Sequence, residues 1–209
     1  FLFIKIRPDL VHLVTLKPIL YGGLVARITG VRVLIAAVAG LGSTFLASSL
    51  LEYIRYFFIK NAIVWILEST KSSVIFQNND DRETLLSNKS DSLKVYLIPG
   101  SGVKLREFPY LPEKTDNLVI TMPARLIRDK GVIEFAGAAK ILFHRGHQLE
   151  FRLLGVPDPA NPRSLTTEEL EGIERDGFVK FLGYQKETAR LYAESNIICL
   201  PSYREGMPK

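Results

Sequence analysis

Residues 118–143 read LVITMPARLIRDKGVIEFAGAAKILF, and this stretch decides the fold. Its first part, 118–124, is a short apolar run typical of a buried strand, and a cationic loop follows it. In 130–143 the apolar residues recur at helical spacing, which predicts a helix with one apolar face. A strand that leads through a short loop into a helix is the unit from which parallel α/β sheets are built.

The same unit recurs along the whole chain. Strands are predicted over 9–15, 32–39, 73–77, 94–98, 118–124, 149–154, 178–182 and 196–200. Helices are predicted over 20–29, 47–70, from an N-cap at Asn79, and over 130–143, 168–175 and 187–194. The pattern lapses only in 103–117, where prolines and mixed charge predict a linker. The sequence therefore predicts an α/β protein of two Rossmann-like units, in residues 1–102 and 118–209.

Composition excludes several classes of protein. With 47% hydrophobic and 23% charged residues among 209, the chain is neither disordered nor of low complexity. The single cysteine, Cys199, excludes an internal disulfide and a cysteine-rich zinc site. A net charge of +5 permits polyanionic partners and selects none. The chain opens at Phe1 rather than at a methionine, and we expect it to be an internal piece of a longer protein.

Candidate binding residues follow the predicted strands, because ligands of parallel α/β sheets bind beyond the carboxyl ends of the strands. Arg125 and Lys130 follow 118–124 and lie near the start of a helix, whose free N–H groups favour an anion. A guanidinium and an ammonium there suit a diphosphate leaving group. Two solvated surface cations are the alternative, and the spacing leaves both open.

Three further turns are weaker candidates. Glu205, beside Gly206, follows the last strand and suits sugar hydroxyls, although a cap of the following helix is the simpler explanation from the residues alone. The turns Gly100-Ser101-Gly102 and Gly40-Leu41-Gly42-Ser43 either approach a ligand or are plain turns. No G-x-G-x-x-G, G-x-x-x-x-G-K-[ST] or G-x-S-x-G motif occurs, which counts against dehydrogenase, P-loop and hydrolase functions.

The stretch 50–67, LLEYIRYFFIKNAIVWIL, is apolar and aromatic but includes Glu52, Arg55 and Lys60. Three charges argue against a helix that spans a membrane. Two interpretations stay open: a helix buried in the protein, or an interfacial helix with Arg55 and Lys60 at the margin of an apolar face. His12 falls inside a predicted strand, and we expect it to pack in the core.

Several motifs in this order resemble glycosyltransferase family 4, which has the GT-B fold. They are FQNNDD at 76–81, GSGV at 100–103, ARLIRDKG at 124–131 and PSYREGMPK at 201–209. The opening PDLVHLVTLKPILYGGLVAR (8–27) and the AGLG loop (39–42) resemble one branch of it. That branch acts in bacterial capsule, O-antigen and glycan assembly and includes polyprenyl-diphosphate-linked N-acetylgalactosaminyltransferases. The resemblance implies two Rossmann-like domains, both incomplete in this chain, facing across a cleft.

The resemblance also implies an activity: retaining transfer of a sugar from a nucleotide-diphosphate sugar, expected to be UDP-linked, with no metal or other cofactor. Arg125 and Lys130 match the family's diphosphate-binding pair. Glu205 matches the first glutamate of the E-x7-E signature, which contacts the donor sugar, and Gly206 and Met207 beside it belong to the same donor site. The second glutamate would fall at position 213, past the last residue.

The turn formed by Leu182, Gly183 and Tyr184 matches the segment that holds the nucleotide base through backbone atoms. Many relatives place a histidine after the second strand, where this sequence has Gly40. The units then take distinct roles: 1–102 on the acceptor side, 103–117 as linker, and 118–209 as the nucleotide-sugar-binding domain.

The partners implied are a nucleotide sugar and a lipid-linked saccharide acceptor, with peripheral contact at the cytoplasmic face of the cell membrane and no nucleic acid. The chain alone is expected to be inactive. Alternatives are a GT-B protein that binds a sugar nucleotide without transferring the sugar, and a GT-B sugar-nucleotide epimerase. A phosphorylase would need a pyridoxal-phosphate lysine, for which no motif is present.

Overall fold

The computed structural model describes residues 2–41, 49–68, 71–86, 93–100, 102–108, 110–113 and 117–205. The chain divides into two compact units. The first spans Phe1–Val103 and takes in Glu205, whereas the second spans Lys104–Arg204. The described part of the expected linker 103–117 therefore belongs with the second unit from Lys104 onward. The roles expected for the two domains stay predictions.

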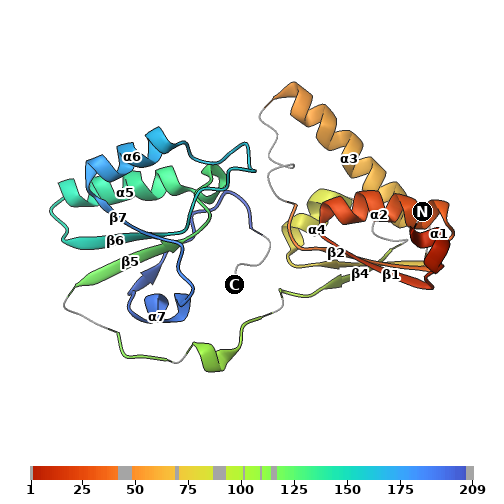
Figure 1. The fold of residues 1–209 in the computed structure, drawn as a ribbon, viewed down its shortest axis with the longest axis horizontal. Coiled ribbons are helices and arrows are strands. Elements are labelled where there is room, and N and C mark those ends of the chain that lie inside the picture. Colours follow the sequence, from red (N-terminus) through yellow and green to blue (C-terminus); the bar gives the residue numbers. More distant parts are fainter. Residues whose placement is uncertain are drawn as a thin grey trace. The chain divides into compact units, whose positions relative to one another are not determined.

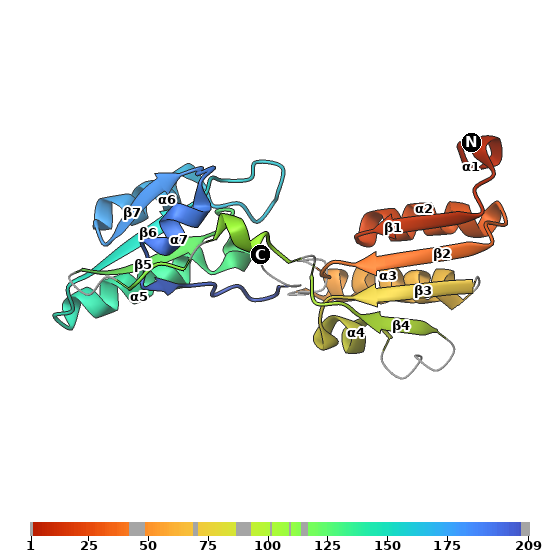
Figure 2. The ribbon, with the colours of Figure 1, turned by 90° about the horizontal axis from the view of Figure 1, so that it is seen from below.

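The first unit is built on a parallel sheet with the strand order β1-β2-β3-β4 (Figures 1 and 2). Its elements are α1 (Leu2–Ile6), β1 (Leu10–Val14), α2 (Leu16–Ile28), β2 (Val33–Val38), α3 (Leu50–Glu68), β3 (Lys71–Phe76), α4 (Asn79–Leu86) and β4 (Lys94–Leu97). Each strand lies beside its predecessor, and right-handed crossovers put α2, α3 and α4 on one face of the sheet.

The cover of this sheet is one-sided. Along β2, residues alternate between half-buried and fully buried, with Leu34, Ala36 and Val38 facing the helices. One prediction in this sheet is wrong. His12 is exposed rather than packed in the core, because β1 is an edge strand and His12 alternates with the buried Leu13.

Two helix starts in the first unit also differ from prediction. α2 begins at Leu16 rather than at 20, since Pro18 is tolerated in a first turn, where no N–H donor is needed. The cap of α4 is Asn78, not Asn79. The Asp81 N–H donates to Asn78 Oδ1 (2.7 Å), and Asn78 Nδ2 donates back to the buried Asp81 carboxylate (3.2 Å).

α2 and α3 pack closely because α2 has glycine at the contact. A Cβ atom on Gly23 would lie 2.6 Å from Cγ2 of Ile66 in α3. The last turns of α3 are buried through Ile63, Val64, Ile66 and Leu67, which join the core of the unit. None of the described helices is long and apolar enough to cross a membrane.

The second unit holds a parallel sheet with the order β7-β6-β5-β8. Its elements are the 3-10 turn η3 (Leu105–Glu107), β5 (Leu118–Pro123), the 3-10 turn η4 (Arg128–Lys130), α5 (Val132–His144), β6 (Leu149–Leu154), α6 (Thr167–Asp176), β7 (Val179–Gly183), α7 (Thr188–Ala193) and β8 (Ile197–Ile198). α5 and α6 cover one face of the sheet and α7 lies on the other (Figure 1). Phe135 of α5 packs edge-on against Phe151 of β6 at 5.3 Å in its core.

The close approach of α2 and α3 yields a stability prediction. In Gly23→Ala the added methyl collides with Ile66, and we expect the free energy of unfolding to fall by about 1–2 kcal/mol despite the better helix propensity of alanine. The matched control is Gly172→Ala, a helical glycine of α6 with no atom within 4 Å of its Cβ position, which should be neutral or stabilising. The measurement is urea unfolding followed by the emission of Trp65 for the first unit and by circular dichroism. Equal midpoints for Gly23→Ala and the parent would contradict the contact.

Candidate functional site

The strand order of the second unit reverses at β5. β6 and β7 lie on one side of β5, whereas β8 pairs with β5 on the other side, in parallel. All four carboxyl ends therefore lie at one edge of the sheet, and the strand order reverses between the loops after β5 and β8. Such a switch point is where parallel α/β sheets bind their ligands. The predicted residues Arg125 and Lys130 follow β5 at this edge.

Backbone hydrogen bonds join the loops at this edge into one surface. The Leu126 N–H donates to Val156 O (3.0 Å), and the Gly155 N–H donates to Gly183 O (2.8 Å). A Cβ atom on Gly155 would lie 1.8 Å from Ala124 O, and its φ of +140° is a conformation that favours glycine. The loops after β5, β6 and β7 are thus held in mutual contact through backbone atoms.

The loops after β5 and β8 approach each other as closely. The Tyr203 N–H donates to Asp129 O at 3.0 Å. Gly131, at φ +77°, stands directly before α5, and a Cβ atom there would lie 2.3 Å from Pro201 O. Only glycine satisfies both the left-handed conformation and this contact.

Arg125 lies on the exposed side of this surface. Its side chain is 61% exposed, and Nη1 donates to the largely buried carboxylate of Asp158 at 2.7 Å. The Asp158 N–H in turn donates to Ser164 Oγ (3.0 Å), which fixes the loop after β6. A guanidinium has five N–H donors, so one bond to Asp158 orients Arg125 and leaves capacity for a ligand. Sequence reasoning missed Asp158, which lies 33 residues away from Arg125 along the chain.

Lys130 is half-buried and ends η4, immediately before Gly131 and the first turn of α5. The neighbouring Asp129 is buried and accepts a hydrogen bond from Arg163 Nε. η4 is therefore held by an ion pair next to Lys130. The first N–H groups of α5, a helix of 13 residues, lie at the same end of the unit and favour an anion there.

The predicted base-binding turn lies at the same edge of the sheet, at the carboxyl end of β7. Leu182 and Gly183 are half-buried and Tyr184 is exposed, with Gly183 in the left-handed region at φ +64°. Gln185 Nε2 donates to Leu182 O at 2.5 Å, which fixes the turn. Across the switch point, the Tyr203 hydroxyl donates to Glu134 of α5 at 2.5 Å, and this hydrogen bond raises the pKa of Tyr203.

Glu205 is half-buried and belongs to the first unit, where its backbone oxygen accepts a hydrogen bond from Asn78 Nδ2 at 3.2 Å. Its assignment to the donor sugar stays a prediction. Gly206 and Met207 lie outside the described residues, as do Gly42, Ser43 and Ser101 of the two glycine turns. Of the first turn, Leu41 is buried, so its side chain serves the core.

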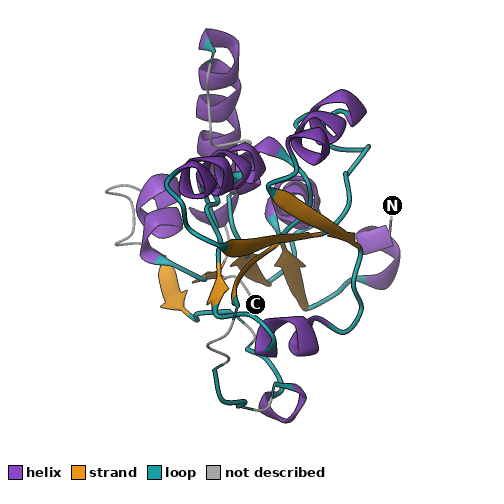
Figure 3. Cartoon of the chain, turned by 90° about the vertical axis from the view of Figure 1, so that its left-hand side faces the viewer, coloured by secondary structure: helices purple, strands orange, loops and turns teal. Residues whose placement is uncertain are grey.

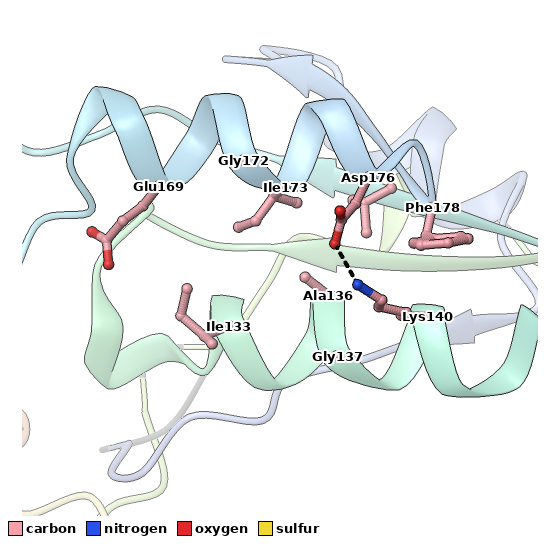
Figure 4. A pocket seen from close by; sticks show the side chains of 10 residues that line it. Ile133, Ala136, Gly137, Lys140, Glu169, Gly172, Ile173, Asp176 and Phe178 are labelled. Atoms are coloured by element: carbon pink, nitrogen blue, oxygen red, sulfur yellow. Dashed lines mark hydrogen bonds and ion pairs between the residues drawn. The ribbon is translucent and has the colours of Figure 1, made fainter. Parts of the chain in front are cut away.

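A groove of about 410 Å³ lies between α5 and α6 (Figure 4). Small and apolar side chains line it, and the ion pair of Lys140 with Asp176 (3.1 Å) crosses it. None of the predicted site residues lines this groove, which belongs to the helical layer rather than to the carboxyl edge of the sheet.

Family models match both units. Residues 2–78 match the model described as glycosyl transferase 4-like, and residues 117–209 match the model described as glycosyl transferases group 1. Between them the two models account for most of the chain. The predicted resemblance to glycosyltransferase family 4 is thereby confirmed.

Three curated relatives of the chain are bacterial glycosyltransferases. It is 27% identical over 214 residues to the capsular polysaccharide biosynthesis glycosyltransferase CapM of Staphylococcus aureus, covering 98% of the chain and 55% of the relative. It is 27% identical over 201 residues to the N,N'-diacetylbacillosaminyl-diphospho-undecaprenol alpha-1,3-N-acetylgalactosaminyltransferase of Campylobacter jejuni, covering 90% and 51%. It is 26% identical over 217 residues to the UDP-Gal:alpha-D-GlcNAc-diphosphoundecaprenol alpha-1,3-galactosyltransferase of Escherichia coli, covering 98% and 54%. The chain thus spans about half the length of these relatives.

A solved structure confirms the predicted GT-B fold class. The chain superposes on sucrose-phosphate synthase from Thermosynechococcus elongatus with a TM-score of 0.76 at 21% identity, covering 99% of the chain and 53% of that protein. The branch resemblance is confirmed as well, since capsule and undecaprenyl-diphosphate-linked transferases are among the relatives.

The contact of Gly131 with Pro201 yields a prediction for the site. Gly131→Ala adds both left-handed strain and a collision with Pro201 O, so we expect the loops after β5 and β8 to separate. If the edge binds a nucleoside diphosphate as predicted, its affinity should fall at least about tenfold, as measured by calorimetry, because the predicted diphosphate-binding loop is displaced. The control is Gly146→Ala, which has the same left-handed conformation at φ +85° with no atom within 4 Å, and it should bind normally. Parent-like affinity in Gly131→Ala would contradict the prediction.

Proposed function

We propose that the full protein transfers a sugar from a nucleotide-diphosphate sugar, UDP-linked, to a polyprenyl-diphosphate-linked saccharide in bacterial surface polysaccharide assembly. The observation that carries the proposal is Arg125. This exposed guanidinium lies beyond β5 at the switch point of the sheet and is oriented by Asp158. An oriented cation at that point matches the chemistry of a diphosphate.

The donor diphosphate accounts for the cations. As the bond between the sugar and the diphosphate breaks, negative charge builds up on the leaving group. Arg125, Lys130 and the first N–H groups of α5 would stabilise that charge at the carboxyl edge of the sheet. In this proposal, side chains and the helix start supply the stabilisation, without an obligatory metal.

The nucleotide base and the donor sugar are assigned to two other segments, the turn after β7 and the residues around Glu205. The turn of Leu182, Gly183 and Tyr184 presents backbone groups for the nucleotide base at the carboxyl end of β7. Glu205, with Gly206 and Met207, is assigned to the donor sugar, because a carboxylate accepts two hydrogen bonds from sugar hydroxyls.

The acceptor and the stereochemistry are proposed from the relatives. Two of their names give an undecaprenyl-diphosphate acceptor and an alpha linkage, and one gives UDP-galactose as the donor. We assign the same acceptor class and an alpha product to this protein. With a donor sugar linked in the alpha configuration, that product means retention. A lipid-linked acceptor also puts the enzyme at the cytoplasmic face of the membrane.

The diphosphate assignment is tested by removing its cations. In the full-length protein, Arg125→Ala and Lys130→Ala should each lower the turnover number about 100-fold, because each removes charge stabilisation of the leaving group. The measurement is transfer from a radiolabelled UDP-sugar to a polyprenyl-diphosphate-linked saccharide. The control is Arg145→Ala, an exposed cation just after α5 at its far end, which should leave turnover unchanged. Near-normal rates in both site variants would remove Arg125 and Lys130 from the mechanism.

The sugar assignment is tested by Glu205→Gln. The variant should impair transfer and leave the affinity for free nucleoside diphosphate nearly intact, since the carboxylate is assigned to the sugar. Calorimetry with UDP and a transfer assay separate the two effects. An equal loss of UDP affinity would move Glu205 to another role. A wild-type protein that binds the sugar nucleotide and transfers nothing would support the non-catalytic alternative.

A further inference from the structure

The loop between β6 and α6 is long for its place in the fold. Leu154 ends β6 and Thr167 begins α6, so residues 155–166 connect them, whereas only residues 184–187 separate β7 from α7. Loops between strands and helices in α/β units ordinarily have about two to six residues, and long loops in a compact domain are commonly functional. The segment leads from β6 to α6 in Figure 1 and is drawn as loop in Figure 3. We call residues 155–166 the β6 loop.

The β6 loop lies along the loop that follows β5. Residues 126–128 run antiparallel to residues 163–165, with a bridge between Ile127 and Ser164. One N–H group of each segment donates to a carbonyl group of the other, in both cases at 2.9 Å. Three prolines restrict the backbone of the β6 loop further: Pro157, Pro159 and Pro162. The β6 loop is therefore a constrained segment, fixed against the loop that carries the predicted diphosphate cations.

Ion pairs join the same two parts of the chain. The pairs are Arg125 with Asp158 (2.7 Å), Asp129 with Arg163, and Arg128 with Glu169 at the start of α6 (2.5 Å). The loop after β5 thus has three charged residues paired with the β6 loop or with the helix that follows it. Its remaining charged residue, Lys130, comes directly after the buried Asp129. The β6 loop therefore holds the segment from which both predicted cations project.

The pair of Arg125 with Asp158 fixes geometry more than it stabilises the fold. The Arg125 side chain is 61% exposed, and ion pairs as exposed as this contribute little to stability. The Asp158 carboxylate, in contrast, has a defined position, because its residue lies between two prolines and its N–H donates to Ser164 Oγ at 3.0 Å. An exposed arginine loses much rotational freedom when it binds a ligand, and one that is held beforehand loses less.

We propose that the β6 loop is the positioning element of the diphosphate site, and that Asp158 is its positioning residue for Arg125. A carboxylate beside an anion site opposes binding by its charge, so orientation of the guanidinium is what it contributes. One bond to Asp158 leaves Arg125 four further N–H donors for the diphosphate. Arg163 holds η4, and with it Lys130, through Asp129. This inference rests on the proposed function and adds the residues that place its cations before charge develops on the leaving group.

The test is the effect of Asp158→Ala on two properties of the full-length protein. The turnover number for transfer from a UDP-sugar should fall about tenfold, because Arg125 is no longer held where charge develops. The affinity for UDP, measured by calorimetry, should not fall, because removal of a carboxylate favours an anion. Asp158→Asn, which keeps the shape of the side chain, should show the same split and serves if Asp158→Ala unfolds. An unchanged turnover number, or an equal loss of turnover and UDP affinity, would overturn the proposal.

A double-mutant cycle determines whether Asp158 acts through Arg125. Arg125→Ala combined with Asp158→Ala should have the turnover number of Arg125→Ala alone, because no guanidinium is left to orient. Combined with Lys130→Ala, in contrast, Asp158→Ala should lower turnover by its own further tenfold, roughly. Losses of Asp158→Ala and Arg125→Ala that multiply would refute the positioning role. The matched control is Asp176→Ala, which removes the carboxylate of the ion pair with Lys140 in the helical layer and should leave turnover unchanged.

A spectroscopic readout separates this inference from the proposed function. In NMR spectra of the protein with isotope-labelled arginine, the guanidinium signals of Arg125 are identified by their loss in Arg125→Lys. The ion pair slows rotation of the guanidinium, so its two Nη groups should give separate signals in the parent and one averaged signal in Asp158→Ala. A parent that shows this change but transfers no sugar would refute the proposed function and leave the positioning role standing. A parent that transfers sugar, with Arg125 signals that do not depend on Asp158, would refute the positioning role alone.

Discussion

The reversal of strand order at β5 is the constraint on which the second unit depends. β8 reaches the far side of β5 only because α7 crosses the other face of the sheet, and β8 itself pairs through just two residues. Neighbouring polar groups reinforce this short pairing. Asn196 Oδ1 accepts from the Val119 N–H at 2.9 Å, and the Asn196 N–H donates to Val119 O at 2.9 Å. The Thr121 and Ser195 hydroxyls lie 2.6 Å apart. Specific polar contacts thus position the loop after β8 at the point where the strand order reverses.

Backbone atoms form much of this edge of the sheet because glycine occupies the points of closest approach. Gly155 lets the loop after β6 lie against Ala124, and Gly131 lets the loop after β8 lie against the start of α5. Loops joined in this way leave little room for side chains between them. The guanidinium of Arg125 is exposed, and an ion pair with Asp158 orients it. Such an arrangement suits a ligand that is recognised by charge and backbone groups rather than by an enclosed apolar pocket.

Much of the fold follows from local patterns in the sequence. The strand 149–154 was predicted with the bounds that the structure has, and α6 starts at the capping box of Thr166 and Glu169, which is readable from spacing alone. Other features depend on which strands are neighbours, which periodicity does not encode. His12 is exposed because β1 is an edge strand, and the pairing of Arg125 with Asp158 joins loops that follow different strands. The cationic pair was predictable because both members follow one strand, whereas its orienting carboxylate was not.

The helix α3 shows a further limit of what sequence periodicity can predict. An apolar helix that is buried and one that lies in a membrane interface give similar residue patterns, so the sequence left both interpretations open. The structure divides the helix between them, since its last turns pack in the core and its first turns are exposed. In the proposed reaction the donor is a water-soluble anion and the acceptor is anchored in lipid by its polyprenyl tail. The two units differ in the same way: the second presents cations at a polar edge, and the first presents an apolar helix with a basic margin.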